Sequence, residues 1–126
     1  ETPGGKVTPH TVKFHRKLEG NLQNVFNELA KDEKFYVKEI GTYSYRRVVG
    51  NPNRLSNHSY GIAIDVNPQC NPYIKNGKVL GGHNVYDQDL SIRSSSDKVV
   101  RTFAKYGFGW GGSYKDYMHF SYFDGR

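Results

Sequence analysis

The spacing of apolar positions predicts two amphipathic helices. Between positions 12 and 31, apolar residues recur at steps of three and four, the period of a helix with one buried face. These residues are Phe14, Leu18, Leu22, Val25, Phe26 and Leu29. A second helix is predicted to begin with Ser95 or Ser96 as its cap and to end at Gly107. Asp97 lies in its first turn, and its apolar face carries Val99, Val100 and Phe103.

Short runs rich in β-branched and aromatic residues predict strands between and after the helices. Three runs lie between the helices, at residues 35–40, 42–49 and 60–66, and a fourth follows at residues 117–123. Residues 67–94 contain several Pro and Gly and no sustained period, which predicts a long loop of the functional or mobile kind. The order of these elements predicts an α+β fold, with a small antiparallel sheet and flanking helices.

The size and composition of the chain indicate one folded domain. The 126 residues include ten Tyr, seven Phe and one Trp, enough aromatic side chains to build a core. We therefore expect a single domain over residues 1–126, with residues 1–10 as an extended lead-in. No apolar run reaches about 18 residues and no signal-peptide core is present, so we expect neither a transmembrane segment nor an export signal in this chain.

The charge balance narrows the choice of partner. Eighteen Lys and Arg against twelve Asp and Glu give a net charge of +6, which favours an anionic partner. Nucleic acid, an acidic membrane and an anionic cell-wall polymer all fit, but the basic residues are scattered from Lys6 to Arg126, which disfavours nucleic acid. With Cys70 as the single cysteine, a metal would be held by His and carboxylate side chains.

The stretch that carries most information about chemistry runs from Ser56 to Asp65. It places His58 just before a predicted strand and Asp65 inside it. An imidazole and a carboxylate can bind a divalent metal together, and a catalytic zinc site needs a third ligand with one position left for water. His119 in the last predicted strand is the best candidate. Asp116, three residues earlier, could take the proton of a metal-activated water.

Each of these residues also has a simpler interpretation. A single His near a strand is more often a surface or core residue than a ligand, and Asp65 could cap a turn with Asn67 and Pro68. The combination of Ser-x-His-x-x-Gly-x-Ala-x-Asp with a later Asp-x-x-His on a separate strand makes coincidence the weaker explanation.

These motifs resemble those of peptidase family M15, the zinc peptidases of the D-alanyl-D-alanine carboxypeptidase and VanY type. The resemblance rests on residues 56–65, on Tyr45-Arg46, and on residues 107–112 leading to 116–120. It implies a Hedgehog/D-Ala-D-Ala peptidase-like fold in which Zn²⁺ is bound by His58, Asp65 and His119. It further implies that Asp116 is the general base and that the substrate is a peptidoglycan stem peptide.

Other residues acquire roles through the same resemblance. Arg46 would stabilise the oxyanion that forms when water attacks the scissile carbonyl. Arg47 follows at once, and because neighbours on a strand point to opposite faces, we expect only Arg46 to reach the metal. Ser56 either hydrogen-bonds the substrate, orients a metal ligand, or closes a turn at residues 53–57. Tyr60 and Trp110 are candidate substrate-binding residues, with a place in the core as the alternative for each.

The sequence thus predicts a zinc-dependent peptidase of peptidoglycan stem peptides, attracted by its charge to the anionic cell wall. The resemblance is compatible with a dipeptidase, a D,D-carboxypeptidase or an L-alanyl-D-glutamate endopeptidase, and with a role in cell-wall remodelling, resistance or phage lysis. The alternative is a zinc-containing binding module without hydrolysis, as in the related Hedgehog domain, although Asp116 and Arg46 favour an enzyme. We expect a monomer that acts at the cell envelope or outside the cell and does not bind nucleic acid.

Overall fold

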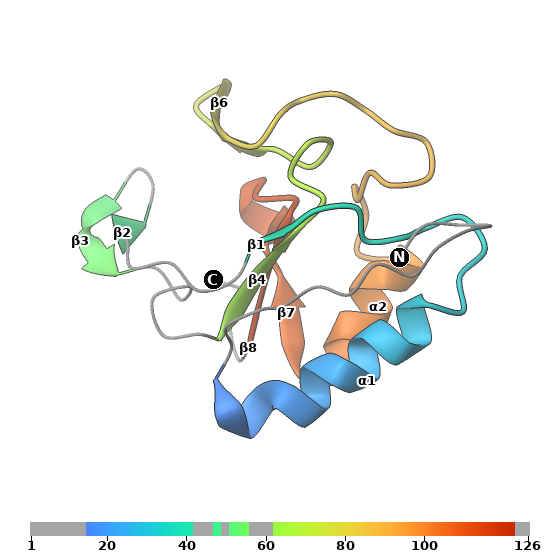
Figure 1. Ribbon diagram of the computed structural model, residues 1–126. Coiled ribbons are helices and arrows are strands. Elements are labelled where there is room, and N and C mark those ends of the chain that lie inside the picture. Colours follow the sequence, from blue (N-terminus) through green and yellow to red (C-terminus); the bar gives the residue numbers. More distant parts are fainter. Residues whose placement is uncertain (1–14, 42–46, 49–50, 56–61, 123–126) are drawn as a thin grey trace.

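The computed structural model describes residues 15–41, 47–48, 51–55 and 62–122 (Figure 1). The helical elements there are η1 (Arg16–Leu18), α1 (Glu19–Leu29), α2 (Lys98–Lys105) and η3 (Gly111–Tyr114). The strands are β1 (Ile40–Gly41), β2 (Arg47–Val48), β3 (Asn51–Leu55), β4 (Ala63–Val66), β5 (Tyr73–Lys75), β6 (Lys78–Gly81), β7 (Phe108–Trp110) and β8 (His119–Tyr122). This content confirms the predicted α+β fold with antiparallel sheets.

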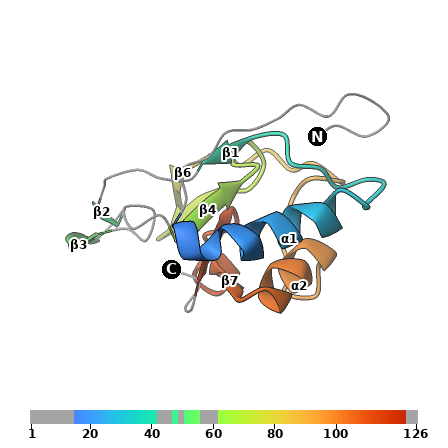
Figure 2. The ribbon, with the colours of Figure 1, turned by 60° about the horizontal axis from the view of Figure 1, so that its bottom comes forward.

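The main sheet of the described residues has four strands in the order β1-β4-β8-β7, and every neighbouring pair is antiparallel. Helices α1 and α2 lie side by side against one face of this sheet in both views (Figure 1, Figure 2). The β2–β3 and β5–β6 hairpins form separate two-stranded sheets that lie away from the two helices (Figure 1). The helices therefore cover one face of the main sheet.

The core fills the space between the helices and this face. Its aromatic centre is Phe103 of α2, whose ring stacks on Phe120 of β8 with 3.9 Å between centroids and meets Phe108 of β7 edge-on. All three are buried, and such aromatic pairs add to the free energy gained by burial. The remaining core residues include Leu22, Val25, Leu29, Phe35, Ile64, Val66, Ile92, Val99 and Val100. Most of these are apolar positions of the predicted helices and of the strand at 60–66.

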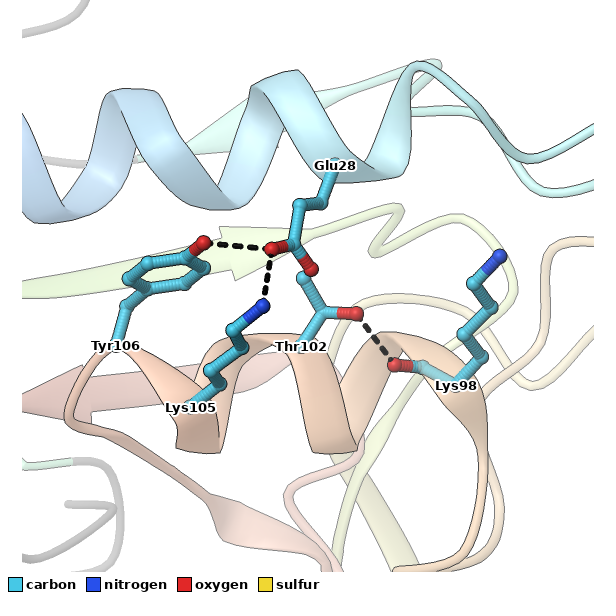
Figure 3. Close-up of polar contacts among 5 residues, drawn as sticks. All are labelled: Glu28, Lys98, Thr102, Lys105 and Tyr106. Atoms are coloured by element: carbon cyan, nitrogen blue, oxygen red, sulfur yellow. Dashed lines mark hydrogen bonds and ion pairs between the residues drawn. The ribbon is translucent and has the colours of Figure 1, made fainter.

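A polar contact joins the two helices at the surface (Figure 3). The carboxylate of Glu28 on α1 lies 2.6 Å from the Lys105 ammonium, and it accepts a hydrogen bond of 2.6 Å from the Tyr106 hydroxyl. These two hydrogen bonds lower the pKa of Glu28 below its ordinary value. Within α2, the Thr102 hydroxyl donates to the Lys98 carbonyl (Figure 3). Glu28 thus fixes the C-terminal end of α2 against α1.

Two predicted boundaries are wrong, and both have local causes. The strand predicted at 35–40 is reduced to β1, because the backbone N–H groups of Lys38 and Glu39 donate to the Asn67 side chain instead of a neighbouring strand. The cap of α2 is Asp97 rather than Ser95 or Ser96. Gly107 does end this helix region, with a φ of 94° that favours glycine.

The predicted loop at 67–94 is also partly wrong, because it contains the β5–β6 hairpin. The two strands are joined by Asn76 and Gly77, whose φ angles of 54° and 75° belong to the type I′ turn that matches the twist of a hairpin. Two further strands, β3 and β7, were not predicted. In β7, Phe108 and Trp110 alternate with glycines instead of polar residues, so the sequence lacks the apolar–polar alternation that predicts a strand.

Candidate active site

The strand register brings Asp65 and His119 together. Asp65 of β4 and His119 of β8 are direct partners across the sheet, and Asp65 Oδ1 lies 3.5 Å from His119 Nδ1. Side chains alternate along a strand, and Ile64 and Phe120 beside them face the helices. Asp65 and His119 therefore share the opposite face. His119 is only 3% exposed, so this imidazole and the carboxylate interact largely away from bulk water.

The chemistry of this pair fits a zinc site. An imidazole nitrogen and a carboxylate oxygen are both common zinc ligands. Here the two candidate ligand atoms, His119 Nδ1 and Asp65 Oδ1, lie 3.5 Å apart. Within the described ranges, no group of three His, Cys, Asp or Glu side chains could hold a metal ion. His58, the third predicted ligand, lies outside these ranges. The structure thus brings together two of the three predicted ligands.

Asp116 is held at the entry to β8 by a tight turn. Its backbone N–H donates to the Gly111 carbonyl at 2.9 Å, and its carbonyl accepts from the His119 N–H at 3.2 Å. A Cβ on Gly111 would come within 2.7 Å of the Asp116 carbonyl oxygen and 3.1 Å of the Asp116 Cβ. Only glycine leaves room for this approach. The turn therefore sets the position of Asp116 relative to His119.

A second contact holds Asp116 from the side of the β5–β6 hairpin. Tyr73 of β5 and Asp116 form an antiparallel bridge. On either side of this bridge, the Ile74 N–H donates to the Lys115 carbonyl at 2.9 Å, and the Tyr117 N–H donates to the Pro72 carbonyl at 3.1 Å. The start of the hairpin and the segment that carries Asp116 thus form a short ladder.

Two buried asparagines fix the chain that follows Asp65. The Asn67 side chain accepts hydrogen bonds from the backbone of the segment before β1 and donates to the Tyr36 carbonyl at 2.9 Å. The Asn71 side chain donates to the Leu90 carbonyl at 3.1 Å and accepts from the Ile92 N–H at 2.6 Å. Both residues are fully buried, so these bonds replace those to water. They join the chain that follows β4 to the segment before β1 and to the segment that leads to α2.

Trp110 lies on the other side of the sheet from Asp65 and His119. It is the cross-strand partner of Phe120, and its partly buried ring packs against the core. Its indole Nε1–H donates to the Tyr117 carbonyl at 2.9 Å. This placement corresponds to the core alternative for Trp110, with the indole also bracing the segment after Asp116.

Several predicted site residues lie outside the described ranges: Arg46, Ser56, His58 and Tyr60. Their roles stay predictions. Arg47 belongs to β2, where the backbone alone is described.

Tyr73 is a neighbour of Asp116 that the sequence pattern did not predict. It falls in the region predicted as a loop, but Asn-Gly between two short apolar runs is the strongest local signal for a hairpin. With that signal, Tyr73 would have been placed on a strand. Burial, and to a smaller extent the negative charge of Asp116, raise the pKa of Tyr73 above its ordinary value.

A match to a known protein family identifies the family of this chain. Residues 50–122, more than half of the chain, match the sequence profile of an M15 peptidase family described as D-alanyl-D-alanine carboxypeptidase. The chain belongs to peptidase family M15. This confirms the resemblance, and the matched range includes His58, Asp65, Asp116 and His119. M15 peptidases are generally zinc-dependent, which agrees with the donor types found here. No significant match was found among curated proteins.

A membrane span is absent from the described part of this M15 chain, in which none of the helices is both long and apolar enough to cross a bilayer.

Proposed function

We propose that this M15 protein is a zinc-dependent peptidase that cleaves a peptide bond in peptidoglycan stem peptides. The observation that carries the proposal is the pairing of Asp65 with His119 across β4 and β8, with Asp116 held three residues before His119. The match to a peptidase family over residues 50–122 supports the same reaction class. The net charge of +6 favours attraction to an anionic cell wall, and so supports action outside the cytoplasm.

In this proposal His58, Asp65 and His119 hold the zinc ion. When bound, zinc supplies a water of lowered pKa and polarises the scissile carbonyl. Asp65 and His119 are cross-strand partners in one sheet, and the register of the two strands already brings their side chains within 3.5 Å of each other. That pre-organisation favours both metal affinity and a fixed geometry for attack.

In this proposal Asp116 acts first as the general base and then as the general acid. Its carboxylate accepts the proton from the attacking water and later delivers it to the leaving amine. The tight turn at Gly111 and the ladder to β5 keep Asp116 in place for both transfers. Arg46 donates hydrogen bonds to the oxyanion that develops on the scissile carbonyl.

Defined stem peptides provide the test. Mass spectrometry of the products is expected to show one bond cut, with activity lost after chelation and restored by Zn²⁺. Release of the terminal D-alanine would identify a carboxypeptidase, whereas cleavage between L-alanine and D-glutamate would identify an endopeptidase. A zinc-loaded protein that binds these peptides but cuts none of them would contradict the proposal and favour a binding module.

Asp116→Asn tests the assignment of the base. Asn keeps the shape of the side chain but cannot take up the proton, so kcat is expected to fall at least about a hundredfold. Zinc content, measured by atomic emission, is expected to stay near one per chain, because Asp116 is not a ligand in this proposal. Asp89→Asn, in an exposed part of the chain, is the matched control. Near-normal turnover of the Asp116 variant would rule out this role.

A further inference from the structure

The β5–β6 hairpin carries the side chain nearest in register to Asp116. Tyr73 and Asp116 are opposite one another in an antiparallel bridge. Residues paired in this way point to the same face, with their Cβ atoms about 4.5–5.5 Å apart. The phenol of Tyr73 therefore extends on the side of the Asp116 carboxylate, where a substrate would meet the base.

Tyr73 is held there by both ends of the hairpin. Before β5, buried Asn71 is hydrogen-bonded to the segment leading to α2. After β6, Gly82 adopts a φ of 65° and packs so closely that a Cβ would lie 2.6 Å from the Pro68 carbonyl oxygen and 2.8 Å from Met118 Cε. The hairpin is thus fastened to the chain on either side of the candidate site. The backbone of Tyr73 is therefore held opposite that of Asp116.

The chemistry of a phenol complements that of the base. The ionised Asp116 carboxylate only accepts hydrogen bonds, whereas a neutral phenol donates one. Tyr73 is half-buried, and both burial and the charge of Asp116 raise its pKa, so its hydroxyl keeps its proton in the neutral range. A stem peptide offers many hydrogen-bond acceptors in its carbonyls and carboxylates, and the ionised Asp116 carboxylate cannot donate to any of them.

We propose that Tyr73 is a substrate-binding residue of this site, whose hydroxyl donates a hydrogen bond to a carbonyl or carboxylate oxygen of the stem peptide. The proposal rests on the proposed function for the identity of the substrate. It makes Tyr73 a determinant of affinity, while Asp116 serves the chemical step.

Tyr73→Phe removes the hydroxyl and keeps the ring. Kinetics with zinc-loaded protein are expected to show KM raised about threefold to tenfold, the range for one lost hydrogen bond, with kcat changed less than twofold. Calorimetric titration of the same peptide into Asp116→Asn protein, with and without Tyr73→Phe, is expected to show the same loss in Kd. Tyr86→Phe is the control, because Tyr86 is 67% exposed on the loop after β6.

The outcomes separate this inference from the proposed function. If wild type cleaves and Tyr73→Phe leaves KM and Kd unchanged, the inference is wrong and the function stands. If wild type binds without cleaving and Tyr73→Phe weakens binding, the function fails and the inference stands. Thermal unfolding of each variant verifies the fold. Tyr73→Leu, which also removes the ring, is expected to weaken binding further, and equal binding by this variant would overturn the inference.

Discussion

Single residues with little room around them set the geometry of the candidate site. Gly111 is the clearest case, because the Asp116 carbonyl oxygen occupies the space where a side chain would begin. His119 and Asp65 depend on register in the same way, since a slip of one residue between β4 and β8 would turn one of them to the helix side. Close backbone packing therefore determines the position of Asp116, and strand register determines the positions of Asp65 and His119.

Gly111→Ala is expected to damage both stability and activity. The added methyl group would lie 2.7 Å from a backbone oxygen, so the turn must shift and carry Asp116 with it. We expect the free energy of unfolding to fall by about 1–3 kcal/mol in urea titrations. We also expect kcat/KM to fall at least tenfold, because catalysis depends on placement within about an ångström.

Gly20→Ala is the matched control for this substitution. Gly20 lies within α1 with nothing within 4 Å of its missing Cβ, so Ala is expected to raise stability by about 1 kcal/mol and leave kcat/KM unchanged. If Gly111→Ala behaved like this control, the turn would not be what positions Asp116.

At the scale of elements, the segment between β4 and α2 links the candidate site to the core. It connects Asp65 to the hairpin and returns to the core at Ile92. Arg93 fastens its two ends together: Nη1 donates to Asn71 Oδ1 at 2.9 Å and Nη2 donates to the Cys70 carbonyl at 3.0 Å. Its guanidinium also lies 4.9 Å from the centroid of the Tyr117 ring, a cation–π contact.

Arg93→Met is expected to loosen this segment. It removes these two hydrogen bonds, a third from Nη1 to the Ile92 carbonyl, and the contact with Tyr117. The free energy of unfolding is expected to fall by about 1–3 kcal/mol in thermal or urea unfolding. Arg101→Met, at an exposed position of α2, is the control and is expected to change stability by less than about 0.5 kcal/mol. Equal effects of the two substitutions would show that Arg93 does not brace the segment. Lys is not expected to replace Arg93, because it lacks the planar fork of donors.

On the scale of the whole molecule, the two faces of the main sheet have different roles. One face carries the core and is covered by α1 and α2 (Figure 2). Asp65 and His119 lie on the other face, as the register of β4 and β8 requires. The helices are joined through Glu28 of α1, Lys105 of α2 and Tyr106, and the end of α1 is followed by Asp32, which accepts bonds from the Lys34 and Phe35 backbone. Stability therefore depends on carboxylates that lie far from the candidate active site in sequence.

These carboxylates predict a loss of stability in acid. Hydrogen bonds from Lys105 and Tyr106 lower the pKa of Glu28. For Asp32, burial raises the pKa, but the backbone N–H donors outweigh it and the pKa is lowered. A lowered folded-state pKa gives stability that is present above the unfolded-state value and lost as pH falls through the folded-state value. The urea midpoint is therefore expected to fall as pH drops from about 5 towards 3.

A variant carrying Glu28→Gln and Asp32→Asn tests this origin. It is expected to be less stable at neutral pH and to show a shallower fall of the urea midpoint in the same pH range, because neither site can then be protonated. An unchanged pH dependence would place the acid sensitivity in other carboxylates.

Local patterns were sufficient for much of this fold. The apolar period predicted α1, the Gly107 stop predicted the end of α2, and β4 falls inside the run predicted at 60–66. The motif around Asp65 and His119 was sufficient for the family. These features depend on neighbours within a few positions in the chain, and the sequence records them directly.

Pairings between distant segments were decided only by the tertiary structure. That Asp65 faces His119 follows from the register of β4 and β8, and that Tyr73 lies beside Asp116 follows from the bridge between β5 and the turn before β8. The strand predicted at 35–40 was wrong for the same reason. The backbone N–H groups of Lys38 and Glu39 donate to the side chain of Asn67, which is distant in the sequence. By itself the sequence determined which residues could do chemistry, because motifs are local. Which of them meet was decided by hydrogen bonding and packing between segments that no local pattern specifies.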